Sequence, residues 1–445
     1  MEQTPPRGRA QAVPSGRLTR AARLGGVAGR VATGMALGAT RDLAAGRRPQ
    51  LRDLLLTPGN ITRFADELAR MRGAAMKMGQ LLSMDAGDLL PPELTEILAR
   101  LRADADHMPP RQLRDVLDGE WGRGWLKRFA KFDAHPIAAA SIGQVHRGRL
   151  PAADGPGREC AIKVQYPGVR RSIDSDVTNV GTLIRMSGLM PPGVALEPLL
   201  HEAKRQLHEE ADYRHEGQQL SRFGALLDGD PHVTLPVLVP DLTTENVLAM
   251  TFVRGRPIEA MASAAQAVRD RIVTVLIDLM LRELFEFGLV QTDPNFANYR
   301  YDPDTGRVVL LDFGACRPYA PEHAAIYRRL VLAARDGAPG AIRQAATETG
   351  FLSDATAKRH VDALVDMIAL AGLPARTVGP YDFGTDRLAD QLREAGQGLA
   401  LDPDFADIPP MEVLYLQRKV AGLYLLASRL GARVDVGALV DRRLG

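Results

Sequence analysis

The chain has 445 residues, enough for two domains or one large bilobal domain, and its balance of apolar and charged residues is that of a globular protein. Its net charge of +2 argues against a general nucleic-acid-binding protein. The two cysteines, Cys160 and Cys316, give neither a disulfide framework nor the spacing of a zinc site, and we expect both to be small buried thiols.

The first fifty residues are strongly basic, since their arginines face only Glu2 and Asp42 as acids. They contain the small, apolar segment LGGVAGRVATGMALGA, which is interrupted by Arg30 and is shorter than the roughly 20 apolar residues of a membrane span. Its glycines recur at four-residue spacing, which allows close helix contact and a homodimer. Three interpretations remain open: a flexible leader, a membrane-surface or helix-pairing segment, and a transit peptide.

A long helix is predicted over residues 57–85. Its apolar residues recur at three- and four-residue spacing and form one buried stripe, which includes Ala75 and Met78. Lys77 and Gln80 lie off that stripe and, being three residues apart, share a second face. The pattern leaves them either as two solvated polar side chains or as one edge of a polar site.

A strand pair is predicted next, formed by SIGQVHRGRL and CAIKVQY with a loop of Gly, Pro and Asp between them. Lys163 lies in the second strand and is either an exposed strand residue or a phosphate-binding candidate. A helix is expected over residues 197–224, where the acids Glu210, Asp212 and Glu216 either pair with Lys163 or belong to a solvated face. A further buried strand, ending in a turn, is expected over residues 247–255.

The stretch QTDPNFANYR, residues 291–300, predicts a shaped loop, because Pro294 disfavours a helical conformation at Asp293. A short strand, the turn YDPDTG and a second short strand follow, and the last ends at Asp312. This layout brings Asp293, Asn298 and Asp312 together. One base and two oxygen ligands are what magnesium-dependent phosphoryl transfer requires.

The tripeptide DFG occurs twice, at Asp312 and again at Asp382. The second copy follows no apolar strand and lacks an upstream aspartate and asparagine at the required spacing, so we interpret Asp382 as part of a loop.

These parts follow one another in the order of the protein-kinase fold. The predicted fold is therefore α+β and bilobal, with an N-terminal helical extension. We divide the chain into four segments: a basic leader (1–50), a helical extension (51–128), a kinase-like N-lobe (129–254) and a mostly helical C-lobe (255–445).

Four motifs depart from ordinary kinases: AAASIGQVH at 138–146, QTD in place of His-Arg-Asp, KMGQ at 77–80 and EADYRHE at 210–216. Together they resemble the UbiB/ADCK family of atypical kinases, the ubiquinone-biosynthesis accessory proteins. The resemblance covers roughly residues 15–430. It is closest to the mitochondrial branch and its bacterial relatives, because the stretch QTDPNFAN is similar to the loop of that branch. We expect none of the C-terminal membrane helices of some bacterial members.

The resemblance implies that ATP and Mg²⁺ are the cofactors. Lys163 resembles the strand lysine that binds the α and β phosphates, with Glu210 as its helix partner. Asp293 resembles the catalytic-loop aspartate, and Asn298 and Asp312 resemble the metal ligands.

The same resemblance assigns further residues around the nucleotide. The alanine-rich loop over the phosphates consists of Ala138, Ala139, Ala140 and Ser141, and the residues from Met250 to Val253 resemble the adenine-binding hinge. Lys77 and Gln80 match the signature of a helix that closes over the active site. Glu216 matches a further acidic position, which we expect to pair with Lys77.

Alanine in place of glycine restricts the phosphate loop, because alanine does not adopt positive φ cheaply. A helix over the site would also block a protein substrate. Both features favour ATP hydrolysis, or transfer of phosphate to a small or lipid substrate, in support of ubiquinone biosynthesis. The alternatives are a protein kinase and a nucleotide-binding scaffold without turnover.

The expected partners are quinone precursors or anionic lipids and ubiquinone-biosynthesis enzymes, with no nucleic acid. We expect peripheral contact with a membrane, on the cytoplasmic side of the inner membrane in a bacterium or on the matrix side in a mitochondrion.

Overall fold

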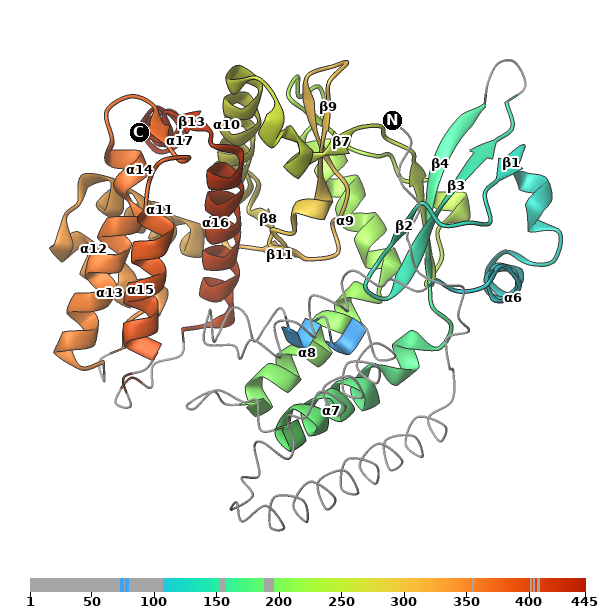
Figure 1. Ribbon diagram of the computed structural model, residues 1–445, viewed down its shortest axis with the longest axis horizontal. Coiled ribbons are helices and arrows are strands. Elements are labelled where there is room, and N and C mark those ends of the chain that lie inside the picture. Colours follow the sequence, from blue (N-terminus) through green and yellow to red (C-terminus); the bar gives the residue numbers. More distant parts are fainter. Residues whose placement is uncertain are drawn as a thin grey trace, which may run out of the picture. The chain divides into compact units, whose positions relative to one another are not determined.

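The computed structural model describes residues 73–75, 77–79, 107–152, 157–187, 196–353, 356–400, 402, 405 and 409–445. The predictions for the leader and for Gln80 lie outside these residues. The chain forms two compact units. The first contains the described residues up to Gly217 together with Leu238–Phe252, and the second contains Gln218–Val237 together with Val253–Gly445. Each unit combines helices with strands (Figure 1).

A five-stranded sheet organises the first unit. Its strands are β1 (Lys131–Phe132), β2 (Ala138–Ala139), β3 (Gly143–Leu150), β4 (Arg158–Gln165) and β6 (Val247–Thr251). All pairs in this sheet are antiparallel, and Lys163 of β4 lies between Val145 of β3 and Leu248 of β6. The predicted strand pair is therefore confirmed, as is the buried strand that follows it.

One face of this sheet carries a core built from β-branched strand residues and aromatic rings. Ile162, Val164 and Val247 pack there with Trp125 and Phe129. The helical elements of this part of the chain are α6 (Pro110–Trp121), η2 (Trp125–Arg128), α7 (Val169–Ser187), α8 (Leu196–Glu210), α9 (Tyr213–Leu226) and η3 (Pro240–Leu242). Cys160 is buried in β4 and Cys316 in β11 (Cys316–Pro318), and both are free thiols, as predicted.

The prediction of one helix over residues 197–224 is wrong, because the chain breaks between α8 and α9. The carboxylate of Asp212 accepts a hydrogen bond of 3.0 Å from the backbone N–H of His215. That bond satisfies one of the free N–H groups at the start of α9, so Asp212 caps a new helix instead of continuing the old one.

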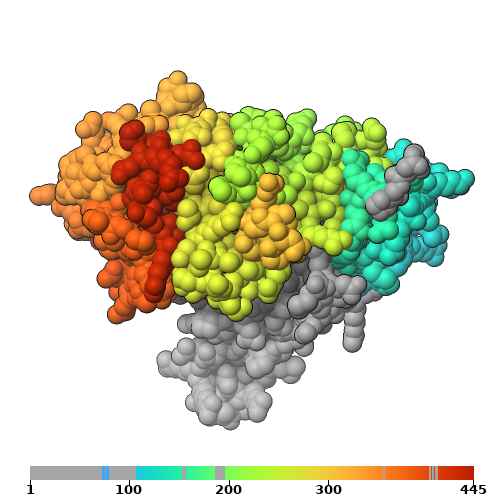
Figure 2. Space-filling view, turned by 90° about the horizontal axis from the view of Figure 1, so that it is seen from above, coloured from blue at the N-terminus to red at the C-terminus, as the bar shows by residue number. Residues whose placement is uncertain are grey.

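The second unit is mostly helical. Its helices are α10 (Gln266–Arg282), α11 (Pro321–Asp336), α12 (Pro339–Thr349), α13 (Lys358–Ala371), α14 (Leu373–Arg376), α15 (Leu388–Ala400), α16 (Met411–Leu430) and α17 (Val436–Leu444), with the shorter turns η4 (Ile258–Ser263), the π-helical η5 (Glu283–Phe287) and η6 (Phe296–Asn298). Helix α17 packs on α10, α11 and α14. Figure 2 shows the C-terminal segment, in red, on the surface beside orange segments of the same unit. None of the described helices has the length and apolarity needed to span a bilayer.

Short strands in this unit support the predicted loop. A four-stranded sheet has the order β5 (Val233–Thr234), β10 (Arg307–Leu310), β9 (Tyr299–Asp302) and β7 (Arg256–Pro257), and β9 and β10 form the predicted hairpin. Strand β8 (Leu289–Gln291) pairs with β11, and β12 (Tyr381–Asp382) pairs with β13 (Arg433–Val434).

The interpretation of Asp382 as a loop residue is wrong, because it ends the short strand β12. Its carboxylate accepts a hydrogen bond from the N–H of Gly384 and pairs with Arg433 at 2.9 Å.

His146 is a buried, neutral histidine in the sheet of the first unit. Its Nδ1 donates to the carbonyl of Asp133 at 2.9 Å, so its Nε2 accepts from the amide of Gln144 at 2.8 Å. The other end of Gln144 accepts from the N–H of Met108. A proton on Nε2 would face a donor, and burial lowers the pKa of His146 from 6.5 to about 4.

We predict that this unit loses stability as the pH falls from 6.5 to about 4. Above pH 6.5 the imidazole is neutral in both states, whereas below it the unfolded chain binds a proton that the folded chain excludes. At about pH 4 the free energy of unfolding should be about 3 kcal/mol lower than it is above pH 6.5. Urea unfolding followed by fluorescence measures it, because the two tryptophans, Trp121 and Trp125, both lie in this unit. The control is His146→Gln, which should flatten the pH dependence; equal slopes would contradict the assignment.

In the second unit, helix α16 packs tightly on the predicted catalytic loop at a glycine. A Cβ on Gly422 would lie 2.2 Å from the Cβ of Pro294. Alanine for glycine usually stabilises a helix by about 1 kcal/mol. We predict the opposite sign here, a destabilisation of about 1–3 kcal/mol from overpacking.

Thermal unfolding followed by circular dichroism tests this expectation for Gly422→Ala. The matched control is Gly224→Ala, also helical and in the same unit, where a Cβ would meet nothing within 4 Å. The control should be stabilised, and a stabilised Gly422→Ala would show that the contact with Pro294 imposes no constraint.

Candidate active site

Lys163 is a buried cation that pairs with Glu216. Its Nζ lies 3.0 and 2.9 Å from the two carboxylate oxygens of Glu216, and the ring of Tyr213 lies 5.0 Å away. The prediction that Glu210 is the partner of Lys163 is wrong. The cause is the helix break at Asp212: Glu210 ends α8, while Glu216 lies in the first turn of α9.

Glu210 instead joins the alanine-rich loop to the KMGQ segment. It accepts a hydrogen bond from the hydroxyl of Ser141, and its carboxylate lies 3.6 Å from the Nζ of Lys77. The expected pairing of Lys77 with Glu216 is therefore wrong. The Lys77 side chain is only 13% exposed, so it is directed inward and is not a solvated lysine.

The helical residues around Lys77 rest on the end of the alanine-rich loop. Ala75 and Met78 are buried, as the predicted stripe requires. A Cβ on Gly73 would lie 3.2 Å from the carbonyl oxygen of Ser141, so the backbone of this helix approaches the loop closely.

The alanine-rich loop is a tight turn between two paired strands. Ala138 and Ala139 form β2 opposite Val145 and Gln144, and the N–H of Ala140 donates to the carbonyl of Gly143 at 2.8 Å. No described residue other than glycine has a positive φ. The turn is therefore built within the conformations that alanine adopts without strain, as expected from its composition.

The predicted hinge begins at the end of β6. Met250 lies opposite Ala161 within the sheet, and the N–H of Phe252 donates to the carbonyl of Glu159 at 2.9 Å. The division between the two units falls directly before Val253. Adenine binding by Met250 and Val253 stays a prediction.

In the second unit, the predicted loop brings Asp293 and Asn298 into contact. The amide nitrogen of Asn298 donates to Oδ2 of Asp293 at 3.0 Å. Asn295 caps the turn η6 through the N–H of Ala297, and the N–H of Leu311 donates to the carbonyl of Asn298. These bonds fix the loop against the hairpin that leads to Asp312.

Asp312 lies next to Asn298 around a small cavity of about 10 Å³, which both residues line. One of its carboxylate oxygens accepts from the N–H of Gly314 at 3.0 Å. The sequence layout therefore predicted correctly that Asp293, Asn298 and Asp312 converge.

Comparison with known proteins identifies the family. Residues 100–345 match the ABC1 atypical kinase-like domain. The chain belongs to this family. It is 37% identical over 433 residues to the mitochondrial atypical kinase COQ8 of Saccharomyces cerevisiae, covering 97% of this chain and 85% of the relative. It is 38% identical over 436 residues to the mitochondrial atypical kinase COQ8B of Rattus norvegicus, covering 96% and 80%.

A solved structure, that of the Rv3197–erythromycin complex from Mycobacterium tuberculosis, superposes with a TM-score of 0.58 at 25% identity, covering 84% of this chain and 92% of that one. The predicted family and the α+β, kinase-like fold are thereby confirmed. So is the prediction of an ATP-using, phosphoryl-transferring atypical kinase of the family that serves ubiquinone biosynthesis.

The donor atoms of this ABC1-family site fit a hard cation held jointly with a nucleotide. In the described part of the chain, no group of three or more His, Cys, Asp or Glu side chains could hold a metal ion. Because the amide nitrogen of Asn298 is used on Asp293, its Oδ1 is the atom available as a ligand. That oxygen and the Asp312 carboxylate match the few protein oxygens that Mg²⁺ takes when phosphates complete its shell.

Sequence reasoning missed two neighbouring residues of α16. Arg418 pairs with Oδ1 of Asp293 at 2.9 Å. Lys419 is buried, with its Nζ 3.3 Å from Glu283, 3.3 Å from the hydroxyl of Tyr299 and 3.4 Å from Gln291. Burial alone would lower the pKa of Lys419, but Glu283 and Tyr299 raise it, so the ammonium stays charged. The segment YLQRKVAG reads as an ordinary helix with a charged face, which carries no signal for either contact.

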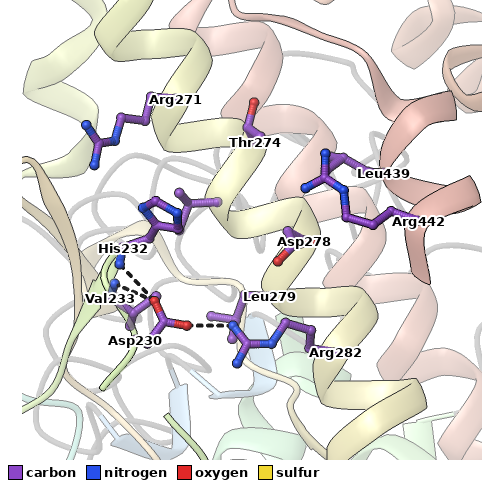
Figure 3. Close-up of a pocket in the computed structure, with 11 residues that line it drawn as sticks. Asp230, His232, Val233, Arg271, Thr274, Asp278, Leu279, Arg282, Leu439 and Arg442 are labelled. Atoms are coloured by element: carbon purple, nitrogen blue, oxygen red, sulfur yellow. Dashed lines mark hydrogen bonds and ion pairs between the residues drawn. The ribbon is translucent and has the colours of Figure 1, made fainter. Parts of the chain in front are cut away.

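A larger cavity of about 150 Å³ lies elsewhere in the second unit (Figure 3). Asp230 and Arg282 form an ion pair there, and Asp230 also accepts from the N–H groups of His232 and Val233. Asp230 therefore holds the start of β5 in place. The lining contains none of the predicted site residues.

The corrected ion pairs predict different costs for two glutamates of one motif. Removing the charge of Glu216 takes away the carboxylate that pairs with the buried Lys163. Glu216→Gln should therefore lower the free energy of unfolding by about 3 kcal/mol or more. Glu210 is 25% exposed. Because the Lys77–Glu210 pair is longer, at 3.6 Å, and more hydrated, Glu210→Gln should lower the free energy of unfolding by less than Glu216→Gln does.

Urea unfolding followed by tryptophan fluorescence compares the two variants within the first unit. The same substitution in both makes each the control for the other. If the free energy of unfolding fell equally in both variants, or further in Glu210→Gln, the result would favour the pairing of Lys163 with Glu210 that the sequence predicted.

Proposed function

We propose that this ABC1-family kinase binds Mg-ATP and transfers its γ-phosphoryl group to water or to a small or lipid acceptor, in support of ubiquinone biosynthesis at a membrane surface. The observation that carries the proposal is the contact of Asp293 with Asn298, beside Asp312. The contact supports assigning one proton acceptor and two oxygen ligands to neighbouring residues of the second unit. A nucleotide-binding scaffold would have no need of that set.

The residues of the second unit take the chemical roles in this proposal. Asp293 orients the attacking hydroxyl or water and accepts its proton. Asn298 and Asp312 hold Mg²⁺, which neutralises charge on the transferred phosphoryl group when it is bound. The bond from the Asn298 amide to Asp293 keeps the base and the metal ligand in fixed register.

The residues of the first unit bind the nucleotide. Lys163 contacts the α and β phosphates, and Glu216, not Glu210, orients it. The turn of Ala138, Ala139, Ala140 and Ser141 covers the phosphates. Met250 and Val253 bind adenine through the backbone.

The contact of Lys77 with Glu210 supports a non-protein acceptor. Through Glu210 and Ser141, the KMGQ helix is tied to the loop that covers the phosphates. A helix in that position leaves little room for a folded substrate protein. It also excludes water, so turnover requires this helix to move.

A membrane site of action is supported by the basic, glycine-striped leader and by the mitochondrial relatives. Lipid-soluble quinone precursors are met at a membrane surface, and arginines are attracted to anionic lipids there. Peripheral attachment, partner enzymes of ubiquinone biosynthesis and a homodimer through the leader glycines belong to the same proposal.

The test is phosphate release from ATP with Mg²⁺, with and without anionic liposomes. We expect liposomes to stimulate release by the wild type, and Asp293→Asn to reduce it at least about hundredfold, the usual contribution of a general base. The control is Asp304→Asn, an exposed aspartate in the turn of the β9–β10 hairpin, which should behave as wild type. Nucleotide binding without release under any condition would favour the scaffold. Transfer of phosphate to a protein would favour a protein kinase.

A further inference from the structure

Three residues on one face of α16 contact the catalytic loop. Arg418 reaches Asp293, Lys419 reaches Tyr299, and Gly422 lies against Pro294 so closely that no side chain fits between them. Residues 418 and 422 are one helical turn apart, which places both on the same side of the helix. The loop is therefore supported along its length by a helix that is more than a hundred residues distant in sequence.

Lys419 anchors this face of the helix. It is 3% exposed and has its nitrogen among Glu283, Gln291 and Tyr299, which come from η5, β8 and β9. A buried ammonium cannot leave such partners cheaply, because withdrawing it would strand Glu283 without a counter-ion. The backbone next to Lys419 is thus held in place, so the neighbouring Arg418 contacts the loop from a fixed position.

Arg418 completes the restraint on Asp293. Its Nη2 binds Oδ1 at 2.9 Å, while the amide of Asn298 binds Oδ2 at 3.0 Å. A carboxylate held at both oxygens cannot rotate about its terminal bond, yet each oxygen keeps a further lone pair for the acceptor. The guanidinium also brings a positive charge to the place where phosphoryl transfer develops negative charge.

We propose that Arg418 is a positioning residue for phosphoryl transfer, which orients the Asp293 carboxylate toward the acceptor from its fixed place on α16. The inference rests on the proposed function. Its side chain is 13% exposed and that of Asp293 is 20% exposed, so the pair is mostly buried and its removal costs some stability. Loss of the orientation of Asp293 should also lower the rate of the chemical step, which is measured at a temperature where each variant is folded.

The experiment compares Arg418→Gln and Arg418→Lys with the matched control Arg429→Gln. Arg429 lies on the same helix and pairs with Glu259 at 2.8 Å on the surface, where the two side chains are 58% and 40% exposed. Steady-state phosphate release from Mg-ATP separates kcat from KM. Thermal unfolding reports the integrity of each variant.

We expect Arg418→Gln to lower kcat at least tenfold with KM for ATP little changed, at a temperature where thermal unfolding shows the variant to be folded. Arg418→Lys should recover part of kcat, because it restores the charge without the planar fork. A third variant, Arg418→Ala, leaves space for free guanidinium, which should restore part of its kcat when added. Arg429→Gln should match the wild type.

A wild-type kcat in Arg418→Gln, with an active wild type, overturns this inference alone. So does a loss of kcat that Arg429→Gln shares, or one matched by loss of ATP binding. Absence of turnover in the wild type overturns the proposed function and this inference together.

Discussion

A lysine buried in a β-sheet requires an anion within reach, because an unpaired ammonium there is too costly to keep charged. Lys163 meets this requirement through Glu216, and much of the first unit follows from that pair. Helix α9 has to begin where Glu216 points back at the sheet, so the chain breaks at Asp212, which caps the new helix. Glu210 then lies at the end of α8, where its carboxylate is beside Lys77 and Ser141.

The break also determines what holds the KMGQ helix. Glu210 contacts Lys77 and Ser141 and so links the helix to the alanine-rich turn. The two glutamates of this short motif thus make different contacts. One orients the lysine that we assign to the phosphates, and the other ties down the loop and helix that we assign to their cover. This arrangement gives a physical reason for the two glutamates of EADYRHE.

The second unit follows the same rule with another buried lysine. Lys419 is paired with Glu283 and lies beside Tyr299, so helix α16 and strand β9 are joined by a charge that cannot be withdrawn cheaply. Around this anchor, Arg418 and Gly422 contact the loop that carries Asp293. The chemistry expected of an ABC1-family kinase therefore depends on rigid supports, in agreement with the small tolerance of phosphoryl transfer for misplaced groups.

The sequence by itself determined the order of the parts, the strand pair around Lys163, the β9–β10 hairpin and the convergence of Asp293, Asn298 and Asp312. These features rest on short-range patterns: strand alternation, turn residues and the effect of proline on its neighbour. Tertiary structure decided which acid meets which lysine, because Glu210 and Glu216 belong to the same helical pattern until Asp212 caps a second helix. It also decided the contacts of Arg418, Lys419 and Gly422. Their partners are distant in the chain, and a charged residue on a helix looks the same in sequence whether it meets water or the carboxylate of Asp293.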